Sequence, residues 1–376
     1  MMAGEPRIDA MTIRQTTERR PKKALKRGWT TGACATAAAT AAYQALITGD
    51  FPDPVTITLP KGEEPAFALN RAELDGGKAT ASVIKDAGDD PDVTHGAEIV
   101  VTVAPGKKGA GVSFHAGPGV GRVTRPGLAL AVGEPAINPG PRAMMEGVIK
   151  DIARRHGISP DVAITVSVQG GEELARKTMN GRLGIEGGLS ILGTTGVVIP
   201  YSCASWIHSI HRGIDVARAG GYRHVAAATG ATSEAAVRKL TGLPEVALID
   251  MGDFAGGLLK YLRKHPVERL TLAGGFGKMV KLAQGHVDLH SSRSRVDLRA
   301  LAKMLASLGA PRAVVAKARK ANTAAEVLGI ANSLGLGLGD LVARQARETA
   351  LATLSGDTAV EVAIFDSQGG FVGHAL

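Results

Sequence analysis

Lys26–Ala42 reads K-R-G-W-T-T-G-A-C-A-T-A-A-A-T-A-A, a tight polar turn followed at once by a nearly pure Ala/Thr helix, predicted over Ala33–Ile47. Methyl-sized side chains allow another backbone, or a large flat ligand, to approach such a helix closely. The turn places Thr30, Thr31 and Gly32 at the helix start, where free N–H groups and the positive dipole end attract anions. The alternative is an Ala-rich helix that packs on a sheet behind an ordinary Thr cap, and general propensities favour it.

The rest of the first half has the pattern of an α+β domain. Strands are predicted at Val55–Leu59, Ala79–Ile84, Glu98–Val103, Val112–His115 and Val162–Val168, with a second helix at Arg142–Arg155. The Gly- and Pro-rich stretch from Gly117 to Pro141 would be a long loop unless it binds something.

The second half repeats strand, polar turn and helix, which predicts a doubly wound, Rossmann-like parallel sheet. The strands are Val225–Ala228, Val246–Ile249 and Leu270–Ala273, and the helices are Ser233–Leu240, Phe254–Arg263 and Lys278–Ala283. Helical sequence over Asp297–Leu354 and a last strand at Val360–Phe365 follow. We therefore expect a disordered basic tail over residues 1–24, an α+β domain over 25–200 and a Rossmann-like α/β domain with C-terminal helices over 201–376.

Composition excludes several classes of protein. Eight Lys or Arg and three Asp or Glu lie in residues 1–27, so more than half of the net charge of +9 is in that segment. Aromatic residues make up only 3% of the chain, which argues against binding of single-stranded nucleic acid. No apolar run is long enough to span a membrane or act as a signal, so we expect a cytoplasmic protein. Two cysteines cannot build a disulfide framework or a zinc site.

Candidate ligand contacts follow the strands of the second half, because parallel-sheet proteins bind ligands beyond the carboxyl ends of their strands. The run Gly274-Gly275-Phe276-Gly277-Lys278 permits close backbone approach but lacks the frame of a phosphate-binding P-loop. Asp250 and Asp253 lie where an acid commonly accepts hydrogen bonds from ribose hydroxyls. A ligand-free turn and solvated loop acids are the alternatives.

Charged residues of the first half are concentrated between Lys85 and Asp92, where four aspartates lie within seven residues. They could bind a divalent cation or, as the better alternative, cap the N–H groups of their own turn. Arg142 and Arg182 flank glycine-rich turns and could pair with ligand carboxylates or with surface acids. The spaced histidine pairs lack a third ligand, so no metal site is predicted.

Several long runs in this chain resemble the cobalt-precorrin-5B C1-methyltransferase family of cobalamin biosynthesis. The runs are Lys26–Ala42, Val83–Gly96, Gly119–Thr124, Ala136–Pro139, Asn180–Gly188, Ile191–Gly196, Thr229–Gly230, Gly274–Lys278 and Asp288–Ser291. They occur in order over residues 25 to 300. The resemblance implies an S-adenosylmethionine-dependent C-methyltransferase that methylates C1 of cobalt-precorrin-5B to give cobalt-precorrin-6A.

The resemblance and the strand ends together give two sets of expected contacts. The anionic corrinoid substrate is expected to contact Thr30, Thr31, Gly32, Lys85, Asp86, Asp89, Asp90, Arg142, Arg182, Thr194 and Thr195. S-adenosyl-L-methionine, the methyl donor, is expected to contact Thr229, Gly230, Asp250, Gly252, Asp253, Gly274, Gly275, Gly277 and Lys278. No acid, base or metal ligand is assigned.

Two other functions compete with this interpretation. One is a nucleotide-dependent small-molecule kinase or oxidoreductase, and the other is a non-catalytic corrinoid carrier. We expect no nucleic-acid partner and no membrane partner, and Ala-rich helices are compatible with a homodimer.

Overall fold

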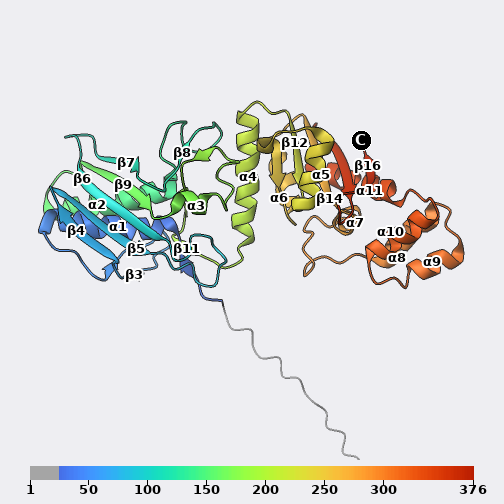
Figure 1. Ribbon diagram of the computed structural model, residues 1–376, viewed down its shortest axis with the longest axis horizontal. Coiled ribbons are helices and arrows are strands. Elements are labelled where there is room, and N and C mark those ends of the chain that lie inside the picture. Colours follow the sequence, from blue (N-terminus) through green and yellow to red (C-terminus); the bar gives the residue numbers. More distant parts are fainter. Residues whose placement is uncertain (1–24) are drawn as a thin grey trace, which may run out of the picture.

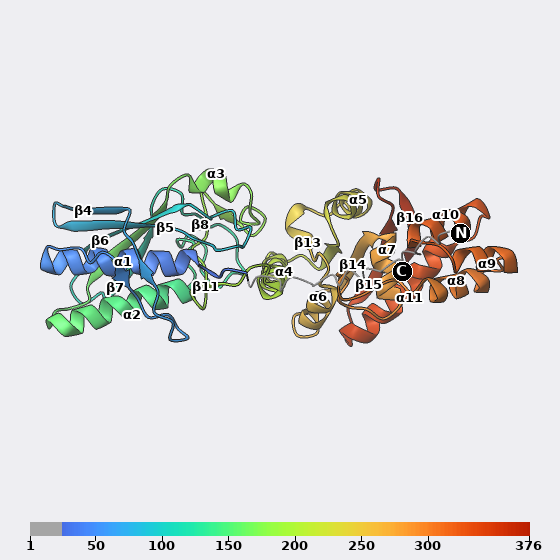
Figure 2. The same cartoon turned by 90° about the horizontal axis from the view of Figure 1, so that it is seen from below.

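The computed structural model describes residues 25–376 as two α/β halves (Figure 1). Helix α4 (Cys203–Ala219) stands between the halves in both orthogonal views (Figures 1 and 2). One hydrophobic core is built from residues between Ala33 and Ile191, and two others from residues between Ile210 and Ala375. The predicted tail over residues 1–24 lies outside the described residues.

Helix α1 (Thr31–Thr48) is the centre of the first half, and it begins two residues before the predicted start. Almost every residue from Thr31 to Ala45 is buried, because the helix packs between the sheet and helix α2 (Pro139–His156). The small side chains thus allow the backbones of the sheet and α2 to approach the helix closely, which agrees with the alternative of an Ala-rich helix packed on a sheet. A left-handed Gly49 ends the helix.

The sheet of the first half has the strand order β4-β5-β6-β9-β7. The strands are β4 (Arg71–Asp75), β5 (Lys78–Ile84), β6 (Glu98–Pro105), β7 (Val112–Ala116) and β9 (Val162–Val168). β7 is parallel to β9 and the other pairs are antiparallel. In β9 buried and half-buried residues alternate strictly, as expected for a strand with one face toward α1.

Short strand pairs join segments that are distant in the sequence. They are β1 (Gly28–Trp29) with β11 (Val197–Val198), β2 (Val55–Thr56) with β3 (Ala66–Phe67), and β8 (Arg122–Val123) with β10 (Ile185–Glu186). Helix α3 (Gly171–Ala175) follows β9. The stretch Gly117–Pro141 is therefore not one long loop, because it contains β8 and the start of α2.

The sheet of the second half has the strand order β13-β12-β14-β15-β16. β12 (His224–Ala228), β13 (Leu248–Asp250), β14 (Arg269–Gly275) and β15 (Ala359–Phe365) are parallel, and β16 (Phe371–Ala375) is antiparallel to β15. A 3-10 turn, Glu245–Ala247, precedes β13.

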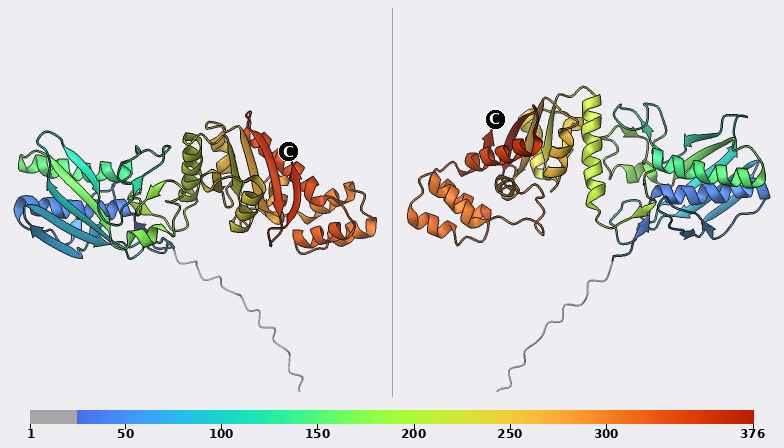
Figure 3. Two further views of the ribbon diagram at one scale, coloured as in Figure 1. Left: turned by 45° about the horizontal axis from the view of Figure 1, so that its top comes forward. Right: turned by 180° about the vertical axis from the view of Figure 1, so that it is seen from behind.

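Helices cover both faces of this sheet (Figure 3). Helix α5 (Ala231–Thr241) packs on the face that contains Ala226 and Phe365. Helices α4, α6 (Ala255–Leu262), α7 (Phe276–Ala283) and α11 (Leu338–Leu354) cover the other face. Helices α8 (Leu298–Ser307), α9 (Arg312–Ala318) and α10 (Ala324–Ser333) form the end of the molecule (Figure 1).

Three sequence predictions need correction. Only Val55–Thr56 of the predicted strand Val55–Leu59 is paired as a strand. Val246 belongs to the 3-10 turn, because β13 begins at Leu248. The strand at Val360–Phe365 is not the last of the sheet, since β16 pairs with it. Local patterns do not reveal such ends, which depend on the partner strand.

Gly28 fixes how closely the N-terminal strand approaches the acidic loop, which is the segment Lys85–Gly96. A Cβ atom at Gly28 would collide with the backbone of Ala87. We expect Gly28→Ala to destabilise the protein by about 1–3 kcal/mol, because backbone on both sides must move. Thermal unfolding followed by calorimetry measures this. Gly147→Ala, with open space at its Cβ position in α2, is the matched control, and equal midpoints for the two variants would contradict the prediction.

Candidate functional site

The start of α1 is closed by the segment Leu192–Gly196, which we call the closing loop. The Thr31 hydroxyl lies 3.0 Å from the Leu192 nitrogen and 3.2 Å from its carbonyl oxygen, and Gly32 donates its N–H to that oxygen at 3.0 Å. The side-chain oxygen of Thr30 accepts a hydrogen bond from the Ala33 N–H, as expected for an N-cap residue. The N–H groups of Gly32 and Ala33, predicted to face an anion, are therefore bonded within the protein. Thr30 and Thr31 are only 7% and 4% exposed.

Asp86, Asp89 and Asp90 of the acidic loop bind neighbouring parts of the chain. Asp86 accepts hydrogen bonds from the Gly88 N–H and the Lys26 ammonium, and Asp89 accepts the Lys26 N–H at 2.6 Å. Asp90 accepts the Tyr201 N–H at 2.8 Å. Of these contacts, the one with Gly88 caps the loop's own turn, as the alternative predicted, whereas those with Lys26 and Tyr201 join the loop to distant segments. The acidic loop thus binds the strand pair β1–β11 at the end where Lys26 precedes β1 and Tyr201 follows β11.

Lys85 forms a buried ion pair under the acidic loop. Its side chain is 1% exposed, and its Nζ lies 2.7 Å from Asp92 Oδ2. Burial of Asp92 alone would raise the pKa of its carboxyl. Lys85, together with the hydrogen bonds from Thr94, nevertheless holds the pKa of Asp92 below its usual range.

The two predicted arginines have partners within the protein. Arg142 donates to the Ile137 carbonyl at 2.7 Å and pairs with Glu134 at 2.7 Å. Arg182 does not join the other predicted substrate residues. It reaches the second half of the chain, where it binds both carboxylate oxygens of Glu234 at 2.8 Å.

The predicted donor residues gather at the carboxyl edge of the second sheet. Thr229 and Gly230 follow β12, Asp250 ends β13, and Gly275 ends β14. A Cβ atom added at Gly230, Gly275 or Gly277 would meet nothing within 4 Å, so open space lies over these positions. At Gly274 it would instead meet the terminal methyl group of Met279 and the side chain of Thr229, so space at this position is limited. Strand β14 passes directly into α7, so the glycines form a junction rather than a loop.

Asp250 has an electrostatic environment unlike that of an ordinary surface acid. Burial raises the pKa of Asp250, the nearby Glu234 raises it further, and Arg182 opposes both. One of its oxygens accepts the Gly252 N–H at 3.2 Å. The second oxygen is free of hydrogen bonds to residues 25–376.

Lys278 forms an ion pair with Asp253, which lies after β13. This pair gives Lys278 a structural reason to stand in the first turn of α7. Lys281 lies one turn further on, buried, with its Nζ 2.8 Å from the Leu289 carbonyl oxygen, and burial lowers the pKa of its ammonium.

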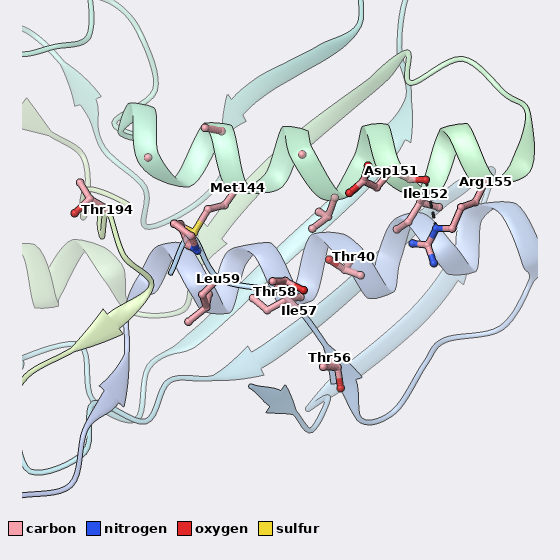
Figure 4. A pocket seen from close by; sticks show the side chains of 15 residues that line it. Thr40, Thr56, Ile57, Thr58, Leu59, Met144, Asp151, Ile152, Arg155 and Thr194 are labelled. Carbon is pink, nitrogen blue, oxygen red and sulfur yellow. Dashed lines mark hydrogen bonds between the residues drawn. The ribbon is translucent and has the colours of Figure 1, made fainter. Parts of the chain in front are cut away.

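A groove of about 470 Å³ lies between α1, α2 and the segment Thr56–Pro60 (Figure 4). It ends at Thr194, which is the one predicted site residue in its lining. Thr40 and Thr58 place hydroxyls along it, with Arg155 at the far end (Figure 4). The groove is separate from the donor edge.

Two aromatic residues, Trp206 beside the donor edge and Tyr201 earlier in the same connecting segment, were not predicted as site residues. A Cβ atom at Gly252 would lie 3.1 Å from the indole nitrogen of Trp206, and Tyr201 has a positive φ of 57°. The sequence offered one signal for them, since aromatic residues are rare in this chain.

Within residues 25–376, no three His, Cys, Asp or Glu side chains gather as a metal ion would need. No helix among these residues is long and apolar enough to cross a membrane.

Comparison with known proteins assigns the chain to a family. The model of the CbiD family matches residues 18–200, and the model of the CbiD C-terminal domain matches residues 288–375. These matches cover more than half of the chain. The chain belongs to the CbiD family.

Relatives match over nearly the whole length. A protein of Paramagnetospirillum magneticum named cobalt-precorrin-5B C(1)-methyltransferase is 61% identical over 94% of this chain and 99% of its own length. A protein of the same name from Brucella anthropi is 58% identical over 94% and 96%. A crystal structure of the cobalamin biosynthesis protein CbiD from Archaeoglobus fulgidus is 28% identical over 72% of this chain and 83% of that chain, with a TM-score of 0.39.

The buried ion pair makes a prediction about stability. Asp92→Asn should lower the free energy of unfolding by about 3 kcal/mol, because it leaves the Lys85 ammonium buried without a counter-charge. Denaturant unfolding measures this, with exposed Asp75→Asn as control. The double variant Lys85→Met/Asp92→Asn should recover most of the loss.

Lowering the pH should remove the stabilisation that the Lys85–Asp92 ion pair provides. Since the pKa of Asp92 is lowered by folding, its contribution is complete above the pKa of the unfolded chain and is lost as the pH falls through the folded value. An Asp92→Asn variant as stable as the wild type would contradict this account of the pair.

Proposed function

We propose that this chain is an S-adenosylmethionine-dependent methyltransferase that methylates C1 of cobalt-precorrin-5B to give cobalt-precorrin-6A in cobalamin biosynthesis. The main support is the name of relatives about 60% identical over nearly their full length. The proposal includes a cytoplasmic location and the two domains predicted at residues 25–200 and 201–376.

The strand order of the second half supports a donor site at its carboxyl edge. With β12 as its first strand, the sheet follows the doubly wound order 2-1-3-4, whose ligands bind where neighbouring connections leave in opposite directions. That point lies between β12 and β14, at Gly230 and Gly275. The open space over these glycines lets a ligand approach the backbone and the first turns of α5 and α7.

Asp250 is suited to hold the ribose of the donor. It lies at the end of the second strand, twenty residues after Gly230, where dinucleotide-binding folds place a ribose-binding acid about 20 residues beyond the glycine turn. The Asp250 oxygen that has no hydrogen-bond partner among residues 25–376 is available to accept hydrogen bonds from the ribose hydroxyls.

The chemistry asks the protein mainly for orientation. The donor supplies a sulfonium methyl group, which an electron-rich ring carbon attacks in line as the carbon–sulfur bond breaks. The chain therefore has to place two ligands, exclude water and balance charge. The glycine junctions and helix starts can do this without a general base.

The first test of this function is calorimetric titration of the purified chain with S-adenosylmethionine, S-adenosylhomocysteine, NAD and ATP. We expect selective binding of the first two, and then methylation of a cobalt-precorrin-5B preparation, measured by mass spectrometry. Binding of NAD or ATP alone would favour a kinase or oxidoreductase. Corrinoid binding without methyl transfer from the donor would favour a carrier.

Asp250→Ala should weaken S-adenosylmethionine binding by about tenfold or more, because charged hydrogen bonds to ribose hydroxyls are lost. Since the pKa of Asp250 is raised, donor affinity of the wild type should also fall as the pH is lowered from neutral, when the carboxylate becomes protonated. Titration calorimetry measures both effects. Asp357→Ala, an exposed acid just before β15 at the opposite edge of the same sheet, is the control. Equal affinity in the two variants would rule out this role of Asp250.

A further inference from the structure

The segment Ile199–Trp206 joins the two halves and exposes unusually large apolar side chains. Ile199 is 55% exposed, Tyr201 is 67% exposed and Trp206 is 46% exposed. The segment begins after β11 in the first half and ends in the first turn of α4, which stands between the halves (Figure 1). Exposed apolar groups at such a junction indicate a binding surface.

The protein holds Tyr201 in an unfavourable backbone conformation. Its φ of 57° lies in the left-handed region, which bulky residues rarely adopt. Asp90 of the acidic loop fixes this conformation by accepting the Tyr201 N–H. The hydrogen bond to Asp90 of the acidic loop thus keeps the Tyr201 ring exposed.

Trp206 connects the same surface to the donor edge. Its indole lies against Gly252, and Gly252 donates its N–H to Asp250, the proposed ribose acid. A ligand lying on Trp206 therefore lies next to the proposed donor site. Gly252 has a φ of 50°, so both its conformation and the indole favour glycine there.

Two arginines flank the exposed rings. Continuing the antiparallel register of β1 and β11 by one residue places Arg27 opposite Ile199. Arg27 is exposed and has no ion-pair partner among residues 25–376. On the other side, Arg293 is 3.3 Å from the Cys203 sulfur at the start of α4, and it is paired with Asp288 at 2.7 Å. Of these two arginines, Arg27 alone offers a positive charge without an ion-pair partner among residues 25–376.

We propose that Tyr201 and Trp206 form a platform for the flat face of the corrinoid macrocycle, with Arg27 receiving one of its carboxylate arms. This inference rests on the proposed function and names the substrate surface that it needs. A conjugated ring system stacks on aromatic rings, and carboxylates at its rim pair with arginine. Such a platform places the macrocycle beside the proposed site of the methyl donor.

The test uses the full chain and two stable corrinoids, cobyrinic acid with free carboxylate arms and cobinamide with amide arms. Tyr201→Asn removes the ring with a residue that tolerates positive φ, and it should weaken binding of both corrinoids by about tenfold. Trp206→Ala should do the same, whereas Tyr201→Phe should bind like the wild type. Arg27→Gln should weaken binding of cobyrinic acid alone. Phe371→Ala, an exposed ring on β16, is the control.

A second measurement on the wild type avoids any effect of the substitutions on folding. Bound cobyrinic acid should protect Tyr201 and Trp206, but not Phe371, from hydroxyl-radical oxidation detected by mass spectrometry. If the wild type binds the corrinoid while the rings stay unprotected and their variants bind equally well, the platform is wrong. If the wild type binds neither corrinoid, the platform is wrong, whereas the proposed function is tested separately by methylation of cobalt-precorrin-5B. Unchanged S-adenosylmethionine affinity in Tyr201→Asn would show that the loss is specific to the macrocycle.

Discussion

The structure of the first half depends on close packing around α1. Because all the buried side chains of α1 except that of Tyr43 are small, sheet and helix backbones approach the helix from several sides. The hydroxyls of Thr36 and Thr40 donate to carbonyls one turn earlier, so burial leaves neither of them unpaired. A longer side chain would have to displace a strand or α2. This constraint sets the position of the closing loop at the helix start.

The charged residues of the first half act chiefly on the protein's own backbone. Asp86, Asp89 and Asp90 hold the strand pair β1–β11 and Tyr201, while Lys85 and Asp92 neutralise each other below. Arg182 links the first half to α5. A rigid support of this kind allows exposed groups at the junction of the halves to keep a fixed orientation, which methyl transfer between two bound molecules requires.

Much of the fold could be predicted from local patterns. The period of apolar residues located β5, β6, β9 and β12, and the strand-turn-helix order predicted parallel pairing in the second half. The same reasoning missed α4, although Ile207, Ile210 and Ile214 recur at helical spacing. It also missed the short strands β1, β3, β8 and β10, because two-residue strands have no period. The binding of the donor and the substrate by the predicted residues remains a prediction.

The sequence by itself determined most of the longer elements, the glycine junctions at the strand ends and the resemblance to the CbiD family, because these depend on residues that are close together in the chain. Only the tertiary structure decided which polar groups are already occupied and which are free. Thr31 and Leu192 are 161 residues apart and Tyr201 and Asp90 are 111 apart, yet each pair is hydrogen-bonded. Such contacts follow from how the whole chain packs, and no local pattern encodes them.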